Sequence, residues 1–234
     1  MEYNMVDSDA LKYSILKKEE SQEVVDFLAQ HFYPREPLST GLHMTYQDNR
    51  EWIPNSVLEW AQSGVSVIAR EPDTGKMAGI LLGTILTREQ SKTYQHALNS
   101  PKTKVKTLHT VLSVLETAVD FFKCYQNVDR ILELAMITVP EKMSGRGVGR
   151  RLVQESEHLA CQQGCQLATS QATAVPSQKL LQRLGYESLY TLDYTTFEIA
   201  GERVFDVDKM LGTTSAKVMV HELKPEDKQL HSKE

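Results

Sequence analysis

The feature that most constrains the fold is a junction in the second half of the chain, where an apolar run at residues 131–139 leads into alternating glycines at 144–151. Beyond the glycines, apolar residues recur at helical spacing. A buried strand followed closely by an amphipathic helix predicts an α/β unit, because each element buries its apolar side against the other. The residues that mark the helix are Val148, Leu152, Val153 and Leu159.

The loop between this strand and this helix has the chemistry of an anion site. Gly145, Gly147 and Gly149 allow backbone N–H groups to converge, and the N-terminus of the helix adds its positive dipole end. Full positive charges come from three arginines of the same segment, Arg146, Arg150 and Arg151. This combination predicts that the loop binds a pyrophosphate group.

Three familiar phosphate loops fail on spacing. A Walker loop needs lysine and then serine or threonine after its last glycine, whereas Arg150 and Arg151 follow Gly149. The dinucleotide-binding fingerprint needs a glycine where Arg150 stands. A protein-kinase loop needs a downstream Asp-Phe-Gly triplet, which the chain lacks. The loop therefore belongs to another class of phosphate site.

This loop resembles the pyrophosphate loop of the GNAT superfamily of N-acetyltransferases, which binds acetyl-CoA. Residues 131–140 are similar to the fourth strand of that family, and residues 180–186 to its late helix, which ends in Leu-Gly-aromatic. The usual loop begins with arginine or glutamine, so Ser144 removes one side-chain contact. The resemblance implies that acetyl-CoA contacts Ile137, Thr138, Val139, Ser144, Gly145, Arg146, Gly147, Val148, Gly149, Arg150 and Arg151.

The same resemblance implies the fold and the extent of the domain. The expected fold is α/β, with a single mixed, mostly antiparallel sheet of about seven strands, flanked by helices and splayed between the fourth and fifth strands. One such domain is expected over residues 1–223, followed by a polar tail at 224–234. A monomer is expected.

Residues 31–38, His-Phe-Tyr-Pro-Arg-Glu-Pro-Leu, are similar to the segment that carries the catalytic glutamate of insect arylalkylamine N-acetyltransferases. Glu36 is the residue that matches. The resemblance implies acetyl transfer to a small biogenic amine by direct attack in a ternary complex. The acceptor is an arylalkylamine such as tyramine, dopamine, octopamine or serotonin, or else agmatine or a polyamine. The alternatives are a protein N-terminal or lysine acetyltransferase and a non-catalytic acyl-CoA-binding module.

Amine chemistry explains why a glutamate is needed. An alkylamine has a pKa near 10 and must lose a proton before its lone pair attacks a thioester, so the reaction needs a general base. A carboxylate is a weak base unless burial raises its pKa. Glu36 has apolar neighbours in the sequence that favour burial, although an isolated glutamate in a loop is ordinarily solvated. These neighbours are Phe32, Tyr33, Pro34, Pro37 and Leu38.

The leaving thiolate and the developing oxyanion need partners as well. The insect branch uses serines near the late helix, and the alignment places Ser177 on one of them, with Thr173 or Ser170 near the other. Ser177 next to Pro176 also fits a helix cap, and the two roles stay open. The resemblance places an oxyanion donor among the backbone N–H groups near Ile137–Val139, where a bulge separates the fourth and fifth strands.

Composition narrows the function class. A net charge of −5 and a pI of about 5.8 argue against a sequence-independent nucleic-acid binder. No apolar run is long enough for a membrane span and no signal peptide is visible, so a cytoplasmic protein without membrane contact is expected. Its three cysteines lack zinc-ligand spacing, so no metal is expected and reduced structural thiols are favoured: Cys124, Cys161 and Cys165.

Periodicity predicts the remaining elements. A helix is expected to end before Pro34, a polar turn to span residues 37–46, and one long helix to span 105–125. A hairpin is expected around the turn at residues 72–75. Four side chains are possible amine-pocket residues, namely His43, Tyr46, His109 and Tyr190.

Overall fold

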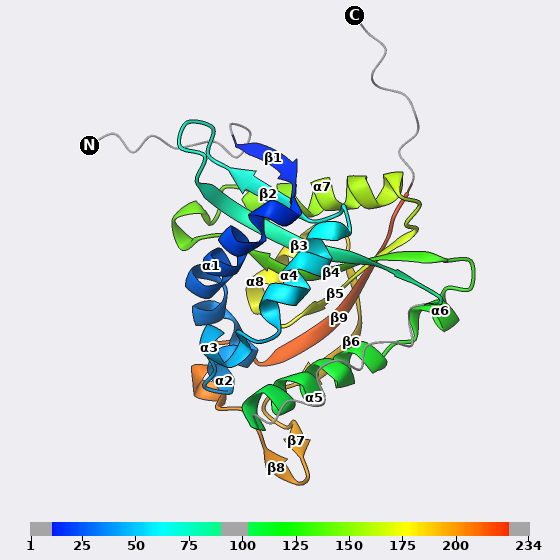
Figure 1. Cartoon of the computed structure of the whole chain (residues 1–234). Helices are drawn as coiled ribbons and strands as arrows, with labels where there is room; N and C mark the ends of the chain where they lie inside the picture. Colours follow the sequence, from blue (N-terminus) through cyan, green and yellow to red (C-terminus); the bar gives the residue numbers. More distant parts are fainter. Residues whose placement is uncertain (1–10, 90–102, 225–234) are drawn as a thin grey trace, which may run out of the picture.

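Seven strands form one mixed sheet, which confirms the expected fold class. The computed structural model describes residues 11–89 and 103–224. Neighbouring strands are antiparallel except β4 and β5, which run parallel. In sheet order the strands are β1 (Lys12–Ile15), β2 (Val67–Arg70), β3 (Met77–Thr87), β4 (Arg130–Thr138), β5 (Leu167–Ala172), β9 (Ser215–Glu222) and β6 (Glu187–Asp193). A small separate hairpin, β7 (Glu198–Ile199) and β8 (Glu202–Arg203), projects below the sheet (Figure 1).

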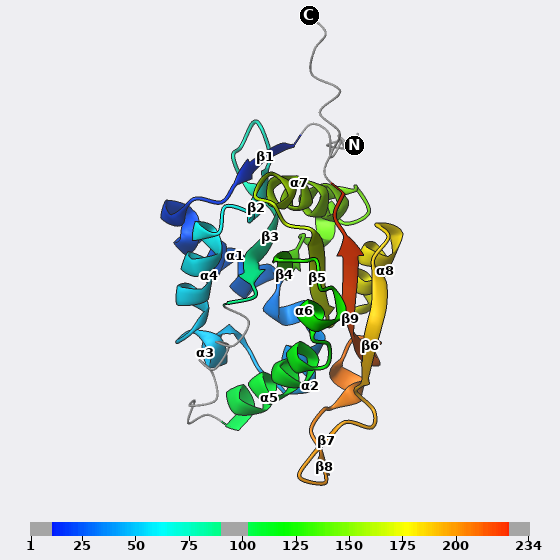
Figure 2. The same cartoon turned by 90° about the vertical axis from the view of Figure 1, so that its right-hand side faces the viewer.

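Helices cover both faces of the sheet (Figure 2). One face carries α7 (Val148–Gln162) and α8 (Val175–Arg183). The other face carries α1 (Ser21–His31), α4 (Ile53–Gln62), α5 (Thr103–Thr117) and α6 (Phe121–Cys124). The shorter helical elements are η2 (Lys18–Glu20), η3 (Tyr33–Arg35), α2 (Pro37–Gly41), α3 (Tyr46–Asn49), η4 (Glu141–Met143) and η5 (Val207–Lys209).

Strand alternation assigns the central side chains to these two faces. Leu132 belongs to the cluster that contains Leu152 of α7, whereas its neighbour Ile131 packs with Phe121 and Phe122 on the opposite face. Successive side chains of a strand point to opposite faces, so β4 can be buried on both. The apolar run in the sequence is therefore a central strand, as expected.

The polar turn expected at residues 37–46 is wrong, because this segment contains the short helix α2 and the start of α3. Glu36 is the N-cap of α2, with Pro37 as its first helical residue, and Thr45 is the N-cap of α3. Proline favours the first position of a helix, where its missing N–H costs nothing. The helix at 37–41 is too short to show a hydrophobic period, so the only local indication of it is the N-cap Glu36 followed by proline.

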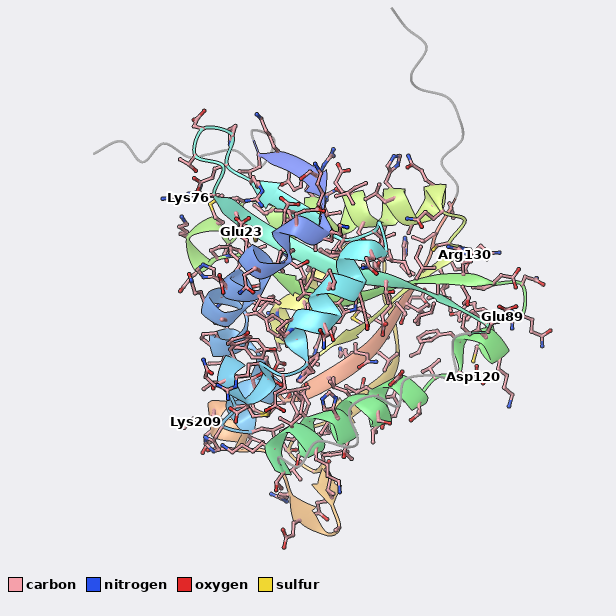
Figure 3. All side chains as sticks on the ribbon, viewed as in Figure 1. Glu23, Lys76, Glu89, Asp120, Arg130 and Lys209 are labelled. Atoms are coloured by element: carbon pink, nitrogen blue, oxygen red, sulfur yellow. The ribbon has the colours of Figure 1, made fainter. Side chains whose placement is uncertain are left out.

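The single long helix expected at 105–125 is also wrong. The helix α5 ends at Thr117, and α6 begins after Asp120, whose carboxylate accepts a hydrogen bond from the Lys123 N–H at 3.1 Å. Asp120 lies at the junction of the two helices (Figure 3). Asp120 has a non-helical ψ of 88° and caps a new helix, although the apolar spacing continues across the break.

The ends of the chain lie largely outside the described residues. Lys224 is the last residue described, so the predicted tail at 224–234 is almost wholly outside them, and the single domain over 1–223 stays a prediction. Within residues 11–89 and 103–224, no helix is long and apolar enough to cross a membrane.

Candidate active site

The glycine loop closes the end of β4 onto the start of α7. Gly145 and Gly147 have φ values of 77° and 79°, in the left-handed region that favours glycine, and Gly147 is the N-cap of α7. The first hydrogen bond back into the loop joins the Arg151 N–H to the Gly147 carbonyl at 3.0 Å. The N–H groups before Arg151 have no intrahelical acceptor, as at any helix start, and suit an anion.

Gly149 serves packing. A Cβ at Gly149 would lie 3.2 Å from Leu180 Cδ2, so glycine lets α7 approach α8 closely. A Cβ at Gly145 would meet nothing within 4 Å, which leaves the outer side of the loop open. The three glycines therefore have different roles: Gly145 and Gly147 adopt left-handed backbone conformations, and Gly149 allows α7 and α8 to pack closely.

The arginines of the loop differ in their surroundings. Arg150 and Arg151 are exposed, and Arg151 Nη2 pairs with Glu155 Oε1 at 2.6 Å within α7. Arg146 is half-buried, with Nη1 3.8 Å from the Met143 sulfur. The ion pair within α7 reduces the charge that Arg151 presents to an anion. Contact between these side chains and acetyl-CoA stays a prediction.

The strands β4 and β5 separate beside this loop. Within the described strands, their parallel register runs from Ile131↔Leu167 to Leu134↔Ser170 and ends there, although both strands continue. On the other side of β4, the register with β3 passes from Leu134↔Gly83 to Met136↔Leu82, which leaves Ala135 as the extra residue of a bulge. The bulge was expected near Ile137–Val139 and instead lies at Ala135, directly after the last residue of β4 that pairs with β5.

Glu36 is held at the β5 side of this opening. It is buried, and its carboxylate accepts hydrogen bonds from the Leu38 N–H at 3.0 Å, the Ser39 N–H at 2.6 Å and the Thr173 hydroxyl at 3.0 Å. Thr173 follows β5 directly. Residues 137 positions apart in the sequence therefore meet through one carboxylate.

Burial raises the pKa of Glu36, and the hydrogen bonds from Leu38, Ser39 and Thr173 lower it in part. The net direction is upward, because desolvation of the charged form is the largest effect. A raised pKa makes this carboxylate a stronger base than a solvated glutamate.

The three predicted hydroxyls lie around the end of β5, and each donates a hydrogen bond within the protein. Ser170 donates to the Leu134 carbonyl at 3.1 Å and Ser177 to the Ala174 carbonyl at 2.8 Å. Of the three, Thr173 is the one bonded to Glu36. Ser177 is not an N-cap, because Ala174 holds that position. A catalytic role of these hydroxyls stays a prediction.

Two tyrosines around Glu36 were missed by sequence reasoning. Tyr194 donates from its hydroxyl to the Thr173 carbonyl at 2.9 Å. Tyr33 is buried, and its hydroxyl has no hydrogen-bond partner among the described residues. Burial, and then the Glu36 charge, raises the pKa of both phenols above the usual range. Tyr33 was noticed only as an apolar neighbour, and Tyr194 is too far from Glu36 in the sequence to be found by pattern.

The possible amine-pocket residues do not converge. The Tyr46 ring lies 5.9 Å from the Tyr33 ring, near Glu36. His43 forms an exposed contact with Asp206 at 3.1 Å, and His109 packs against Trp52 with ring centroids 5.3 Å apart. Tyr190 lies half-buried on β6. Tyr46 thus packs against the tyrosine three residues before Glu36, whereas the side chains of His43 and His109 contact other residues.

A cavity of about 450 Å³ lies between the α5–α6 segment and strands β4, β5 and β9. Its lining includes Glu116, Glu133, Thr169 and Gln171. Burial, and secondarily the Glu133 charge, raises the pKa of Glu116 to about 7. A carboxyl group whose pKa is raised in the folded state favours folding when it is protonated.

We therefore expect Glu116 to contribute roughly 1 kcal/mol of stability, after allowance for solvent screening, which is lost as the pH rises from about 4.5 to about 7. The contribution is complete below the unfolded pKa and is lost as the pH passes the folded pKa. Urea unfolding of wild type and Glu116→Gln at about pH 5 and about pH 8 measures it. The variant should show the flatter pH dependence, and Glu59→Gln, on the exposed side of α4, should keep the wild-type slope. Equal slopes for wild type and Glu116→Gln would contradict the assignment.

The three cysteines form no disulfide and lie in different surroundings. Cys124 is exposed, Cys161 half-buried and Cys165 buried. Burial raises the pKa of Cys165 to about 11, the reverse of what a nucleophile needs. Among residues 11–89 and 103–224, no group of three or more metal-binding side chains is arranged to hold a metal.

Comparison with known proteins places these features in a family. Residues 28–186 match the acetyltransferase (GNAT) family. The structure is similar to arylalkylamine N-acetyltransferase 2 from Aedes aegypti, with a TM-score of 0.81 and 25% identity over 92% of this chain and 99% of that chain. It is also similar to the Drosophila melanogaster polyamine N-acetyltransferase that forms N-acetylagmatine, with a TM-score of 0.78 and 24% identity over 91% of this chain and 100% of that chain. Arabidopsis thaliana NAA60, solved with acetyl-CoA, shares the fold with a TM-score of 0.50 and 12% identity over 91% of this chain and 98% of that chain.

Proposed function

Because this chain belongs to the GNAT family of acetyltransferases, we propose that it transfers the acetyl group of acetyl-CoA to the primary amine of a small biogenic amine. The acceptor is an arylalkylamine, or agmatine or a polyamine, and it attacks directly in a ternary complex. The likeness to an Aedes aegypti arylalkylamine N-acetyltransferase supports a small amine as acceptor.

The observation that carries this proposal is the position of Glu36. Its carboxylate is buried at the edge of the β4–β5 opening, and burial raises its pKa toward the range in which it accepts a proton from an amine. Thr173 is half-buried, whereas Glu36 is buried, and the Thr173 hydroxyl donates to the Glu36 carboxylate at 3.0 Å. The Thr173 hydroxyl takes a proton from the ammonium group of the substrate, directly or through water, and passes its own proton to Glu36.

The same pair can return the proton. When Glu36 is protonated, its O–H donates to the Thr173 oxygen, and the Thr173 proton becomes available to the leaving thiolate. Backbone N–H donors such as those of Leu38 and Ser39 cannot reverse in this way. Thr173 is therefore the hydroxyl that we place in the reaction, while Ser170 and Ser177 hold backbone carbonyls.

The donor side of the site fits acetyl-CoA. The N-terminal N–H groups of α7, at Val148 and Gly149, would hold the pyrophosphate, with Arg146 and Arg150 nearby in the chain. The unpaired edge of β4, around Thr138, offers backbone groups to the pantetheine arm and to the developing oxyanion. When bound, acetyl-CoA supplies the activated acyl group.

A thiol-release assay tests the proposal. With acetyl-CoA as donor, we expect tyramine, serotonin or agmatine to release CoA well above the no-amine background, with a KM between about 1 µM and 1 mM. Mass spectrometry should find the N-acetylated amine. The control is the same assay with N-acetyltyramine, which has no primary amine.

The other candidate functions give different results. Acetylation of a peptide pool with no small-amine turnover would indicate a protein acetyltransferase. Tight acetyl-CoA binding by calorimetry, without turnover of any amine or peptide, would indicate a non-catalytic binding module. Either result overturns the amine proposal.

A further inference from the structure

The width of the opening between β4 and β5 is not fixed by hydrogen bonds between these two strands. Beyond Leu134 and Ser170, β4 continues to pair with β3 as far as Thr138, and β5 with β9 as far as Ala172. Each strand is thus held on its outer side. Between them, the described register offers no ladder hydrogen bonds past Ser170.

Arg35 holds the β4 side of the opening. Its Nη2 donates to the Val139 carbonyl at 2.6 Å and lies 3.5 Å from the Thr138 hydroxyl, and its Nε donates to the His31 carbonyl at 3.1 Å. The Thr138 hydroxyl also donates to the His31 carbonyl, at 3.2 Å. The guanidinium therefore ties the end of α1 to the end of β4, with a charge-assisted hydrogen bond on the strand.

Glu36, the next residue, holds the β5 side through the hydroxyl of Thr173 at 3.0 Å. Two adjacent residues, with Cα atoms about 3.8 Å apart, thus bond to the residues that directly follow the two separated strands. Arg35 reaches β4 and Glu36 reaches the residue after β5. A shift of either strand end would strain or break one of these bonds.

We propose that Arg35 and Glu36 form a clamp across the splayed strands, in which Arg35 is a positioning residue that sets the end of β4 against the general base. The inference rests on the proposed function and adds to it a residue with no chemical role of its own. In the proposed function, the β4 backbone around Thr138 binds the thioester and Glu36 takes the proton of the amine. Fixing one against the other holds the two reactants at attacking distance.

Replacement of Arg35 tests the clamp. Methionine keeps the length of the side chain and removes its donors, so Arg35→Met should lower kcat by about 10- to 100-fold, the loss expected for a misplacement of about 1 Å. Lysine keeps the charge but cannot donate to two carbonyls in the same fixed geometry, so Arg35→Lys should recover part of this loss. The KM for the amine should change far less than kcat.

A binding measurement separates the clamp from turnover. By calorimetry, Arg35→Met should bind acetyl-CoA about 10-fold more weakly than wild type, because the β4 edge that receives the pantetheine arm is less ordered. The affinity of Arg35→Met for ADP should equal that of wild type, because ADP lacks the pantetheine arm and would bind through its pyrophosphate to the loop before α7. Equal acetyl-CoA affinity in wild type and Arg35→Met, with equal kcat, overturns the inference. Absence of amine turnover in the wild type overturns the proposed function instead and leaves the binding comparison valid.

Arg88→Met is the matched control. Arg88 is also an exposed arginine that donates to backbone carbonyls, to Phe122 at 2.9 Å and Tyr125 at 3.3 Å, away from the opening. The Arg88→Met variant should lose about as much thermal stability as Arg35→Met, but it should keep the wild-type kcat and the wild-type affinity for acetyl-CoA. If Arg88→Met lost kcat as Arg35→Met does, the effect would be general loosening, and the clamp would be wrong.

Discussion

Replacing Glu36 by glutamine should lower kcat by about 10²- to 10⁴-fold, the range for loss of a general base. The amide cannot take the proton that the attacking amine must lose. Because burial raises the pKa of Glu36, the wild-type rate should increase with pH through that raised pKa, since only the ionised carboxylate acts as base. This acidic limb should disappear in Glu36→Gln. Steady-state kinetics with a saturating amine, measured across pH, check both effects.

Stability has to be measured in the same variant. The Glu36 carboxylate accepts backbone N–H groups of both Leu38 and Ser39, and a glutamine would turn its NH₂ group toward one of them. Such a donor–donor contact costs about 1–3 kcal/mol. Calorimetric binding of acetyl-CoA at a temperature where the variant is folded separates loss of chemistry from loss of fold. Full wild-type turnover in folded Glu36→Gln would remove the base assignment.

Replacing Gly147 by aspartate should weaken acetyl-CoA binding by on the order of 100-fold. Gly147 is the N-cap of α7 at a φ of 79°, a conformation that aspartate and asparagine tolerate better than other side chains. An added carboxylate about 5 Å from a phosphate charge costs about 3 kcal/mol at an effective dielectric of 20. The same carboxylate favours the helix N-terminus, so folding should not suffer.

Gly147→Asn is the matched control, because it has the same shape without the charge. We expect asparagine to reduce affinity only a few-fold, and the gap between the two variants to shrink as salt screens the repulsion. Titration calorimetry with acetyl-CoA at low and high ionic strength measures this gap. Equal affinity of the two variants at low salt would mean that no anion binds at the start of α7.

Local sequence patterns predicted most of the structure around the glycine loop at residues 144–151. The strand β4, the glycine loop and α7 follow one another over residues 130–162, so hydrophobic period and glycine spacing reveal them without long-range information. The hairpin of β2 and β3 was found in the same way. The family resemblance then supplied the mixed sheet and its splay, which the register confirms.

Other elements were hidden because their signals are short or depend on distant contacts. The helix at 37–41 has one turn and no period, and the break between α5 and α6 rests on the Asp120 cap inside a continuous apolar pattern. The bulge at Ala135 appears only when β4 is paired with β3. The two helix caps are local but weak signals, whereas the bulge depends on a distant strand and cannot be derived from neighbouring residues.

The residue types and their spacing were enough to predict the anion loop and to propose Glu36, because a glycine-rich loop and a carboxylate next to proline are local features of the chain. Tertiary structure decided what Glu36 can do. Its burial, its bond to Thr173 and the bond from Arg35 to Val139 exist only once η3 and α2 pack against the ends of β4 and β5. The pKa of a carboxyl group depends on the solvent and donors around it in space, so the sequence could propose Glu36 as the base, whereas only the fold could raise its pKa.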